Sequence, residues 1–88
     1  MISQKYTVNS TASKVLDSAP SARTIYLHVM GNGIVYLGNS NVTTANGLPV
    51  EKHSAPLPIF VPPHEELWAV DGALGEDLRI LRPSKDAN

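Results

Sequence analysis

Apolar and polar residues alternate over short runs along most of the chain, and this period of two predicts β-strands. The runs cover residues 4–8, 14–16, 23–30, 34–37, 48–52, 57–61, 65–70 and 77–82. Turn-forming residues interrupt them at intervals of about 8–12 residues, a spacing typical of sandwiches and barrels. Prolines at positions 49, 56, 58, 62 and 63 exclude a long helix through the middle of the chain.

This pattern predicts an all-β fold, a small antiparallel β-sandwich, with a closed β-barrel as the alternative. We expect a single β domain over residues 1–82, followed by a polar C-terminal tail over residues 83–88. The segments 1–8 and 83–88 are candidate arms that reach a neighbouring subunit. If this is correct, deleting residues 1–8 abolishes binding to a particle and leaves the sandwich folded.

The central segment 34–49 contains two turn signals between extended pieces. Gly38-Asn39-Ser40-Asn41 predicts a tight turn after the strand 34–37, and Val42-Thr43-Thr44 forms a second β-prone run. Asn46-Gly47 is a dipeptide favoured in type I′ hairpin turns. Upstream, Gly31-Asn32-Gly33 predicts a turn that folds residues 23–38 into a β-hairpin.

Composition excludes several classes of function. The 88 residues carry seven Lys and Arg against eight Asp and Glu, and the basic residues are scattered, so no basic stripe for nucleic acid is present. There is no cysteine for a disulfide or thiolate site. No apolar run approaches the roughly 20 residues of a membrane helix, and the first residues show no signal core, so we expect synthesis in the cytoplasm and no membrane partner.

The order of several segments resembles a group of small bacteriophage virion proteins. A strand ending Val-Tyr-Leu-Gly is followed by Asn-Ser-Asn-Val-Thr-Thr and Asn-Gly-Leu-Pro, then by Leu-Trp-Ala-Val at 67–70 and Leu-Arg-Ile-Leu at 78–81. The resemblance covers residues 23–82. It implies a structural virion protein without catalytic residues or cofactors, made in the host cytoplasm. It further implies a capsid decoration or cement (minor capsid) protein on the capsid surface, binding the major capsid protein or another virion protein as a symmetric homo-oligomer, with a trimer favoured.

Residues 23–30 and 57–61 are apolar on both faces, although a two-layer sandwich needs only one apolar face per strand. Such a strand either lies buried in the centre of the fold or contacts another chain. The residues proposed for this interface are Tyr6, Val8, Tyr26, His28, Met30, Ile59 and Phe60.

The titratable residues do not form a recognisable metal or catalytic motif. His28, His53 and His64 lie far apart, and the carboxylates of Glu65 and Glu66 beside the last one do not complete the short ligand spacing that zinc sites show. The acidic residues Asp71, Glu76 and Asp77 flank a glycine-containing turn whose spacing differs from a calcium loop. We therefore expect no metal site and no enzyme activity.

The aromatic residues leave a second function open, a carbohydrate- or host-binding β-sandwich module associated with a tail or fibre. Trp68 is the only tryptophan, and an exposed indole with polar residues beside it could stack on a sugar. The preferred interpretation places Trp68 and Phe60 in the core, because large aromatic side chains dominate small cores.

Overall fold

The computed structural model describes residues 1–52, 55–72 and 75–83. Within these residues the chain forms eight β-strands: β1 (Ile2–Val8), β2 (Ser13–Leu16), β3 (Arg23–Val29), β4 (Val35–Gly38), β5 (Leu48–Val50), β6 (Leu57–Val61), β7 (Leu67–Asp71) and β8 (Glu76–Arg82). None of the described residues forms a helix of the length and apolarity that crossing a bilayer requires.

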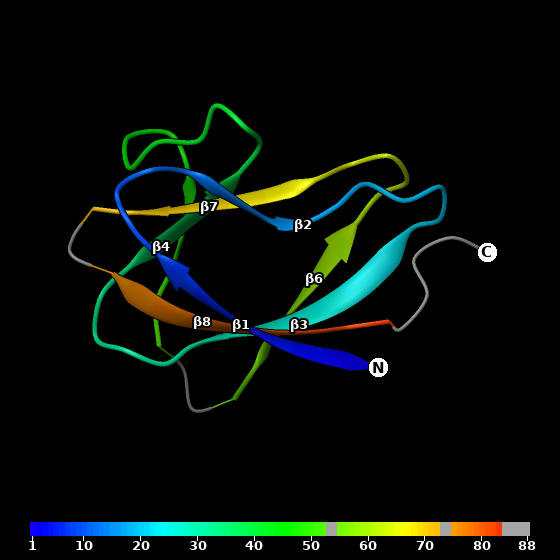
Figure 1. Cartoon of the computed structure of the whole chain (residues 1–88), viewed down its shortest axis with the longest axis horizontal. Coiled ribbons are helices and arrows are strands. Elements are labelled where there is room, and N and C mark those ends of the chain that lie inside the picture. Colours follow the sequence, from blue (N-terminus) through cyan, green and yellow to red (C-terminus); the bar gives the residue numbers. More distant parts are fainter. Residues whose placement is uncertain (53–54, 73–74, 84–88) are drawn as a thin grey trace.

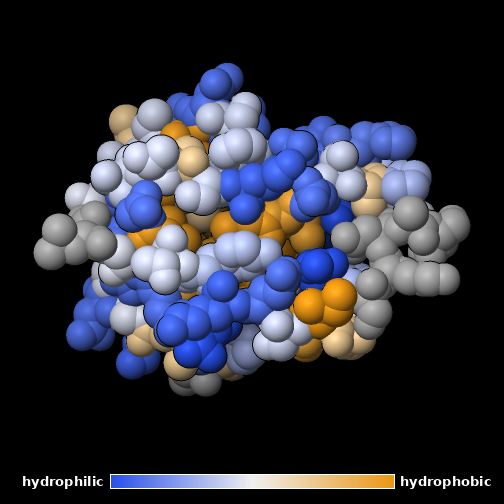
Figure 2. Space-filling view, in the orientation of Figure 1, coloured by the Kyte–Doolittle hydropathy of each residue, from blue (hydrophilic) through white to orange (hydrophobic). Residues whose placement is uncertain are grey.

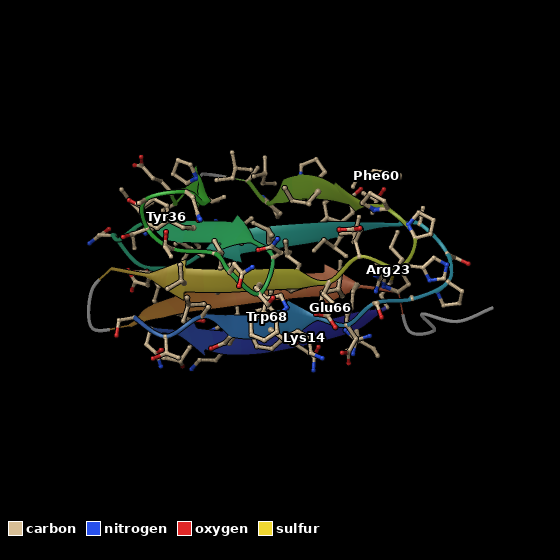
Figure 3. All side chains as sticks on the ribbon, turned by 90° about the horizontal axis from the view of Figure 1, so that it is seen from above. Lys14, Arg23, Tyr36, Phe60, Glu66 and Trp68 are labelled. Carbon is tan, nitrogen blue, oxygen red and sulfur yellow. The ribbon has the colours of Figure 1, made fainter. Side chains whose placement is uncertain are left out.

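The strands form two antiparallel sheets of four strands each (Figure 1). Sheet A has the order β1-β8-β3-β6, and sheet B has the order β2-β7-β4-β5. Both sheets are open, and they stack face to face with their strands closely aligned (Figure 3). The predicted antiparallel β-sandwich is therefore confirmed, and the closed barrel is not formed.

The core lies between the sheets and follows from the alternation in the sequence. The most deeply buried large side chains come from the two central strands of sheet A: Ile25 and Leu27 of β3, and Leu78 and Ile80 of β8. Sheet B covers them with Val15, Leu16, Val35, Leu37, Val50 and Ala69. Each fully buried aliphatic side chain stabilises the fold by about 1.5–3 kcal/mol relative to an exposed one.

Residues 1–8 do not form an arm that leaves the domain. Residues 2–8 form β1, which pairs with β8 without interruption from Ile2↔Arg82 to Val8↔Glu76. Val8 is 0% exposed, and Tyr6 packs against the core. The prediction of a dispensable N-terminal arm is wrong, because this segment covers one side of the core. Residues 84–88 of the other predicted arm lie outside the described residues.

The predicted hairpin over residues 23–38 is also wrong. β3 pairs with β6 and β8 in sheet A, whereas β4 pairs with β5 and β7 in sheet B, so the intervening turn crosses between sheets. The reason is visible at Glu76, whose buried carboxylate accepts a hydrogen bond from the backbone N–H of Gly33 (2.9 Å). A Cβ atom at Gly31 would lie 2.1 Å from Glu76 Oε1, so this turn needs glycine to fit around the carboxylate.

The segment 39–47 differs from its prediction in two ways. Residues 42–44 form no strand; instead Val42 is buried, and the segment is a loop between β4 and β5. Gly47 donates its N–H to Thr43 O (2.9 Å), but positive φ angles occur among the described residues only at His64 and Gly75. A type I′ turn requires positive φ at both central residues, so Asn46-Gly47 does not form one.

Candidate functional site

The outer face of sheet A carries a cross-strand row that is apolar on β8, β3 and β6 and ends at a serine on β1. The register places Ser3 opposite Leu81, Leu81 opposite Tyr26, and Tyr26 opposite Pro58. Phe60, one pleat further along β6, pairs with Thr24 and is 66% exposed. Tyr26 and Leu81 are 42% and 37% exposed, which is high for apolar side chains in the middle of a sheet. We call this surface the sheet A face.

The sheet A face explains why β3 and β6 are apolar on both sides. β3 is central in its sheet, yet its second apolar face points to solvent and is not buried beneath another layer. Four of the residues predicted for an interface lie here: Tyr26, His28, Met30 and Phe60.

The other three residues predicted for the interface do not lie on this face. Val8 is fully buried, and Tyr6 and Ile59 pack against the core from inside the sandwich. All three occupy inward positions of β1 and β6, where the alternation turns them toward sheet B. Burial excludes Val8 from a surface contact, whereas the interface assignment of Tyr6 and Ile59, which are partly exposed, stays a prediction.

A row of basic residues runs beside the apolar row. The register places Lys5 opposite Arg79 and Arg79 opposite His28. Two of these residues, Arg79 and His28, line a hollow of about 410 Å³. Its lining also includes Ser3, Tyr26, Pro56 and Leu81. Asp77 lies in the next row and accepts two hydrogen bonds from Arg79, at 2.9 and 3.0 Å. These bonds lower the pKa of Asp77 and raise the pKa of Arg79.

The four edge strands of the sandwich differ in how well they are protected against pairing with another chain. β5 and β6 carry Pro49 and Pro58, which lack a donor for a further ladder, and the register of β2 shifts between Lys14 and Leu16. β1 has seven residues in regular register, with no proline and no bulge. Of the four edges, β1 is therefore the one suited to accept another strand.

The side of the sandwich between β1 and β2 leaves part of the core visible from outside. Figure 2 shows apolar atoms at the bottom of a slot between polar rims on this side. Part of the slot is a hollow of about 150 Å³ whose lining includes Tyr6, Val15 and Leu16. Gln4 closes one rim, because its Oε1 accepts hydrogen bonds from Tyr6 Oη (2.8 Å) and Arg82 Nε (3.0 Å).

The outer face of sheet B carries the only tryptophan. Trp68 lies in β7 between Lys14 of β2 and Gly38 of β4, and its side chain is partly exposed. It is not a member of the buried core cluster, and neither is Phe60. The interpretation of both aromatic residues as core is therefore wrong; the core of this small sandwich is entirely aliphatic apart from the partly buried Tyr6.

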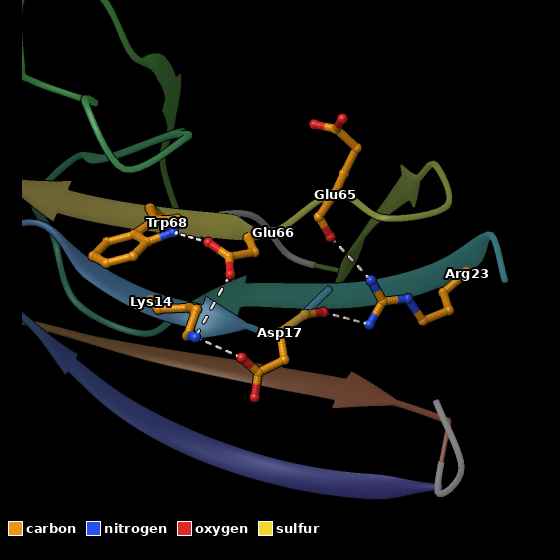
Figure 4. A network of polar contacts seen from close by, with 6 residues as sticks. All are labelled: Lys14, Asp17, Arg23, Glu65, Glu66 and Trp68. Carbon is orange, nitrogen blue, oxygen red and sulfur yellow. Dashed lines mark hydrogen bonds and ion pairs between the residues drawn. The ribbon is translucent and has the colours of Figure 1, made fainter. Parts of the chain in front are cut away.

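A chain of polar contacts holds the Trp68 indole by its edge (Figures 3 and 4). Trp68 Nε1 donates to Glu66 Oε1 (2.9 Å), and Lys14 Nζ lies 3.6 Å from Glu66 Oε2 and 2.6 Å from Asp17 Oδ1. The hydrogen bond with Asp17 raises the pKa of Lys14, and the same bond lowers the pKa of Asp17.

Arg23 continues the polar chain at the end of β3. Its guanidinium donates to Asp17 O (2.8 Å) and Glu65 O (3.1 Å), so it ties together two loops that are distant in sequence (Figure 4). Arg23 is buried, and it fixes the loop that carries Asp17 relative to the start of β7. Sequence reasoning missed this network, since residues 14, 17, 23, 66 and 68 show no common spacing.

The residues considered for metal binding are not brought together. Among residues 1–52, 55–72 and 75–83, no three His, Asp or Glu side chains form a group that could hold a metal ion. His28 lies on the sheet A face and His64 in the turn after β6, while His53 lies outside the described residues. Glu76 faces the glycine turn at 31–33, whereas Asp77 faces Arg79 on the opposite side of β8.

The sequence matches no protein-family model and no curated protein. A solved structure is similar to the chain, that of a protein from Bacillus endospore appendages, which are described as a novel family of disulfide-linked pili. The TM-score is 0.54 at 19% identity, and the match covers 92% of this chain and 81% of that one. At this identity the likeness shows a shared β-sandwich fold.

Proposed function

We propose that this protein is a structural subunit of a bacteriophage virion, in particular a capsid decoration protein that docks on the outer shell through its sheet A face. The observation that carries the proposal is the apolar row formed by Leu81, Tyr26 and Pro58 across an otherwise ordinary sheet. An exposed apolar surface with a polar rim is typical of a protein–protein contact. The resemblance over residues 23–82 supports the location on a phage particle.

The charges beside the row indicate what kind of surface the partner presents. Lys5, Arg79 and His28 form a basic row, and Asp77 offsets the charge of Arg79 by its two hydrogen bonds. A complementary shell surface has an apolar centre with acidic residues along one side. Repeated around the symmetry axes of a shell, such contacts gain strength through multivalency even when each one is weak.

The unprotected edge of β1 supports self-association by strand addition. Two copies that pair β1 with β1 are related by a two-fold axis and join their A sheets into one sheet of eight strands. We therefore propose that the oligomer that docks on the shell is a two-fold dimer and not the expected trimer. β1 pairing is detectable by hydrogen exchange, because strand addition protects the amides of residues 2–8 that point away from β8.

The first experiment is quantitative mass spectrometry of purified virions of the phage that encodes the chain. A copy number comparable to that of the major shell protein is expected for a decoration protein. A few copies per particle would contradict shell decoration and favour a tail or connector position. Absence from virions would overturn the phage assignment.

A matched pair of variants then tests the docking face. Leu81→Lys places a charge in the apolar row, whereas Leu48→Lys makes the same change at an exposed leucine (59%) at the edge of sheet B. We expect Leu81→Lys to abolish binding to shells that lack the protein and Leu48→Lys to leave binding unchanged. Equal binding by both variants would show that the sheet A face does not dock.

The likeness to a pilus protein favours a second candidate, a subunit of a filament. Strand addition that does not close into a ring produces filaments. The 88 residues contain no cysteine, so such a filament would be held by non-covalent contacts and not by disulfides. Electron microscopy of the purified protein at high concentration distinguishes the two, since a decoration protein gives closed oligomers.

A further inference from the structure

We propose that the Trp68 side of sheet B is a binding site for a neutral saccharide. This site lies on the opposite layer of the sandwich from the sheet A face, so both surfaces can be occupied together. The proposal does not depend on the phage assignment, because its test uses the isolated chain.

The indole of Trp68 lies outside the core and is partly exposed on the outer face of sheet B. Its cross-strand neighbour in β4 is Gly38, which has no side chain to cover the ring from that direction. The only polar atom of the ring, Nε1, is already satisfied by Glu66, so the ring is held by its edge. A ring fixed in this way loses little conformational entropy when a ligand stacks on its face.

A hollow of about 280 Å³ lies at Gly38, the residue of β4 that pairs with Trp68. Its lining consists of Gly38, Asn39, Val42 and Asn46. Local hydrogen bonds hold the loop: Asn39 Oδ1 accepts from Asn41 N (2.9 Å), and Asn46 Oδ1 accepts from Thr43 N (2.8 Å). These bonds use the amide oxygen of Asn39, and within the described part of the chain its Nδ2 group makes no hydrogen bond, so this donor can reach a ligand.

These groups match the chemistry of a sugar ring. The apolar C–H face of a pyranose stacks on an indole, and its hydroxyl groups both donate and accept hydrogen bonds. Asn39 offers a donor on one side of Trp68, while Glu66 and Asp17 offer acceptors and Lys14 a donor on the other. A hollow with a few placed polar groups next to a partly exposed aromatic side chain is a common form of such a site.

Other ligand classes fit less well. Nucleic acids and acidic sugars meet two carboxylates, Asp17 and Glu66, that both pair with Lys14 and offset its charge. A quaternary ammonium group needs several aromatic faces, and the tyrosine of this outer face, Tyr36, pairs with Val70 and not with Trp68 (Figure 3). The balance of charges and the single ring therefore favour an uncharged ligand.

The test is a titration of the ¹⁵N-labelled protein, followed by NMR through the Trp68 indole N–H and the amides of residues 38–47. The probes are neutral trisaccharides of glucose, galactose, mannose, N-acetylglucosamine and rhamnose, with trigalacturonic acid and tetramethylammonium chloride as charged comparisons. We expect at least one neutral trisaccharide to give saturable shifts at these positions, with a Kd of about 1–10 mM. The charged probes should give no saturable shift at the same concentrations.

Variants separate stacking from a general surface effect. Trp68→Ala should weaken binding by about tenfold or more, and Trp68→Phe should keep part of the affinity because it retains an aromatic face. Phe60→Ala, which removes an exposed ring on sheet A, should have no effect. If Trp68→Ala does not fold, Trp68→Phe and Glu66→Gln carry the comparison. The proposal is overturned if no neutral probe gives saturable shifts, if tetramethylammonium binds at the same positions, or if the Trp68 variants bind normally.

Discussion

In the turn that crosses from sheet A to sheet B, the effect of Gly31→Ala on stability should depend on the carboxylate of Glu76. The substitution should destabilise the protein when the carboxylate is present and stabilise it when the carboxylate is absent. Gly31 has no left-handed φ, so its backbone accepts alanine without strain. What excludes alanine is Glu76, because a Cβ at position 31 would lie 2.1 Å from Oε1, where ordinary contact begins at 3.4 Å. In the Gly31→Ala variant the carboxylate must move away from the turn.

The magnitude follows from the bond that this movement breaks. Glu76 accepts a hydrogen bond from Gly33 N at 2.9 Å, and a bond to a charged group contributes about 1.5–3 kcal/mol. Replacing glycine by alanine gives back about 0.4–1 kcal/mol, because the unfolded chain loses conformational freedom. We therefore expect Gly31→Ala to lower the free energy of unfolding by about 1–2 kcal/mol.

The same substitution should be stabilising when the carboxylate is absent. In the Glu76→Ala background nothing remains at 2.1 Å, so only the entropic gain of about 0.4–1 kcal/mol is left. Glu76→Ala is itself expected to cost about 1–3 kcal/mol, since the N–H of Gly33 loses its partner. The double-mutant cycle thus has a coupling energy of about 2 kcal/mol.

Urea denaturation measures all four proteins, followed by the fluorescence of the single tryptophan and by circular dichroism. Gly31→Ala should lower the midpoint by about 1 M in the parent and raise it slightly in Glu76→Ala. Gly72→Ala is the control, because among the described residues its Cβ would meet Thr44 Cγ2 alone, at an ordinary 3.4 Å. Equal destabilisation by Gly31→Ala in both backgrounds would refute the role of the carboxylate.

Three further predictions test the alternation, the role of β1 and the acid dependence. Ile80→Ala should cost about 2–5 kcal/mol in urea denaturation and Leu81→Ala less than about 1 kcal/mol, because only Ile80 points into the core; similar costs would contradict the assigned register. Deleting residues 1–8 should leave the chain unfolded by circular dichroism, whereas a folded product would restore the arm interpretation. The hydrogen bonds from Arg79 lower the pKa of Asp77, whose ordinary value is 3.8. Their stabilising effect is therefore complete above about pH 4 and disappears as the pH falls through the folded pKa, so Arg79→Ala should flatten acid denaturation in that range, and an unchanged profile would exclude this contribution.

Much of the secondary structure could be read from the sequence because the alternation is local. The runs 4–8, 14–16, 57–61 and 77–82 each became a strand within a few residues of its expected bounds. The prolines also gave reliable information, since the segment that they interrupt contains no helix among the described residues, and Pro49 and Pro58 lie in edge strands. These results depend only on neighbouring residues, on backbone sterics and on the missing donor of proline.

The errors concern contacts between residues that are distant in sequence. The turn at 31–33 looked like a hairpin turn, and only the approach of Glu76, 43 residues beyond Gly33, shows that it joins two sheets. Residues 1–8 looked like an arm, since weak alternation does not reveal that β8 pairs with residues 2–8. A local pattern cannot specify which strand becomes the neighbour of another.

The candidate sites divide in the same way. Two apolar faces on β3 and β6 were visible in the sequence, but whether the second face meets solvent or another layer depends on how the sheets stack. Trp68 was visible as the single tryptophan, whereas its edge-held position beside Glu66 and opposite Gly38 required the fold.

The sequence by itself determined the all-β class, the strands and the faces of β3, because these follow from period, turn chemistry and the absence of helix-forming stretches. The tertiary structure alone decided which strands share a sheet, which edge stays open and which aromatic rings reach the surface. These features arise from pairing and packing between segments that are far apart in the chain. The free energy of such contacts cannot be inferred from a local sequence pattern.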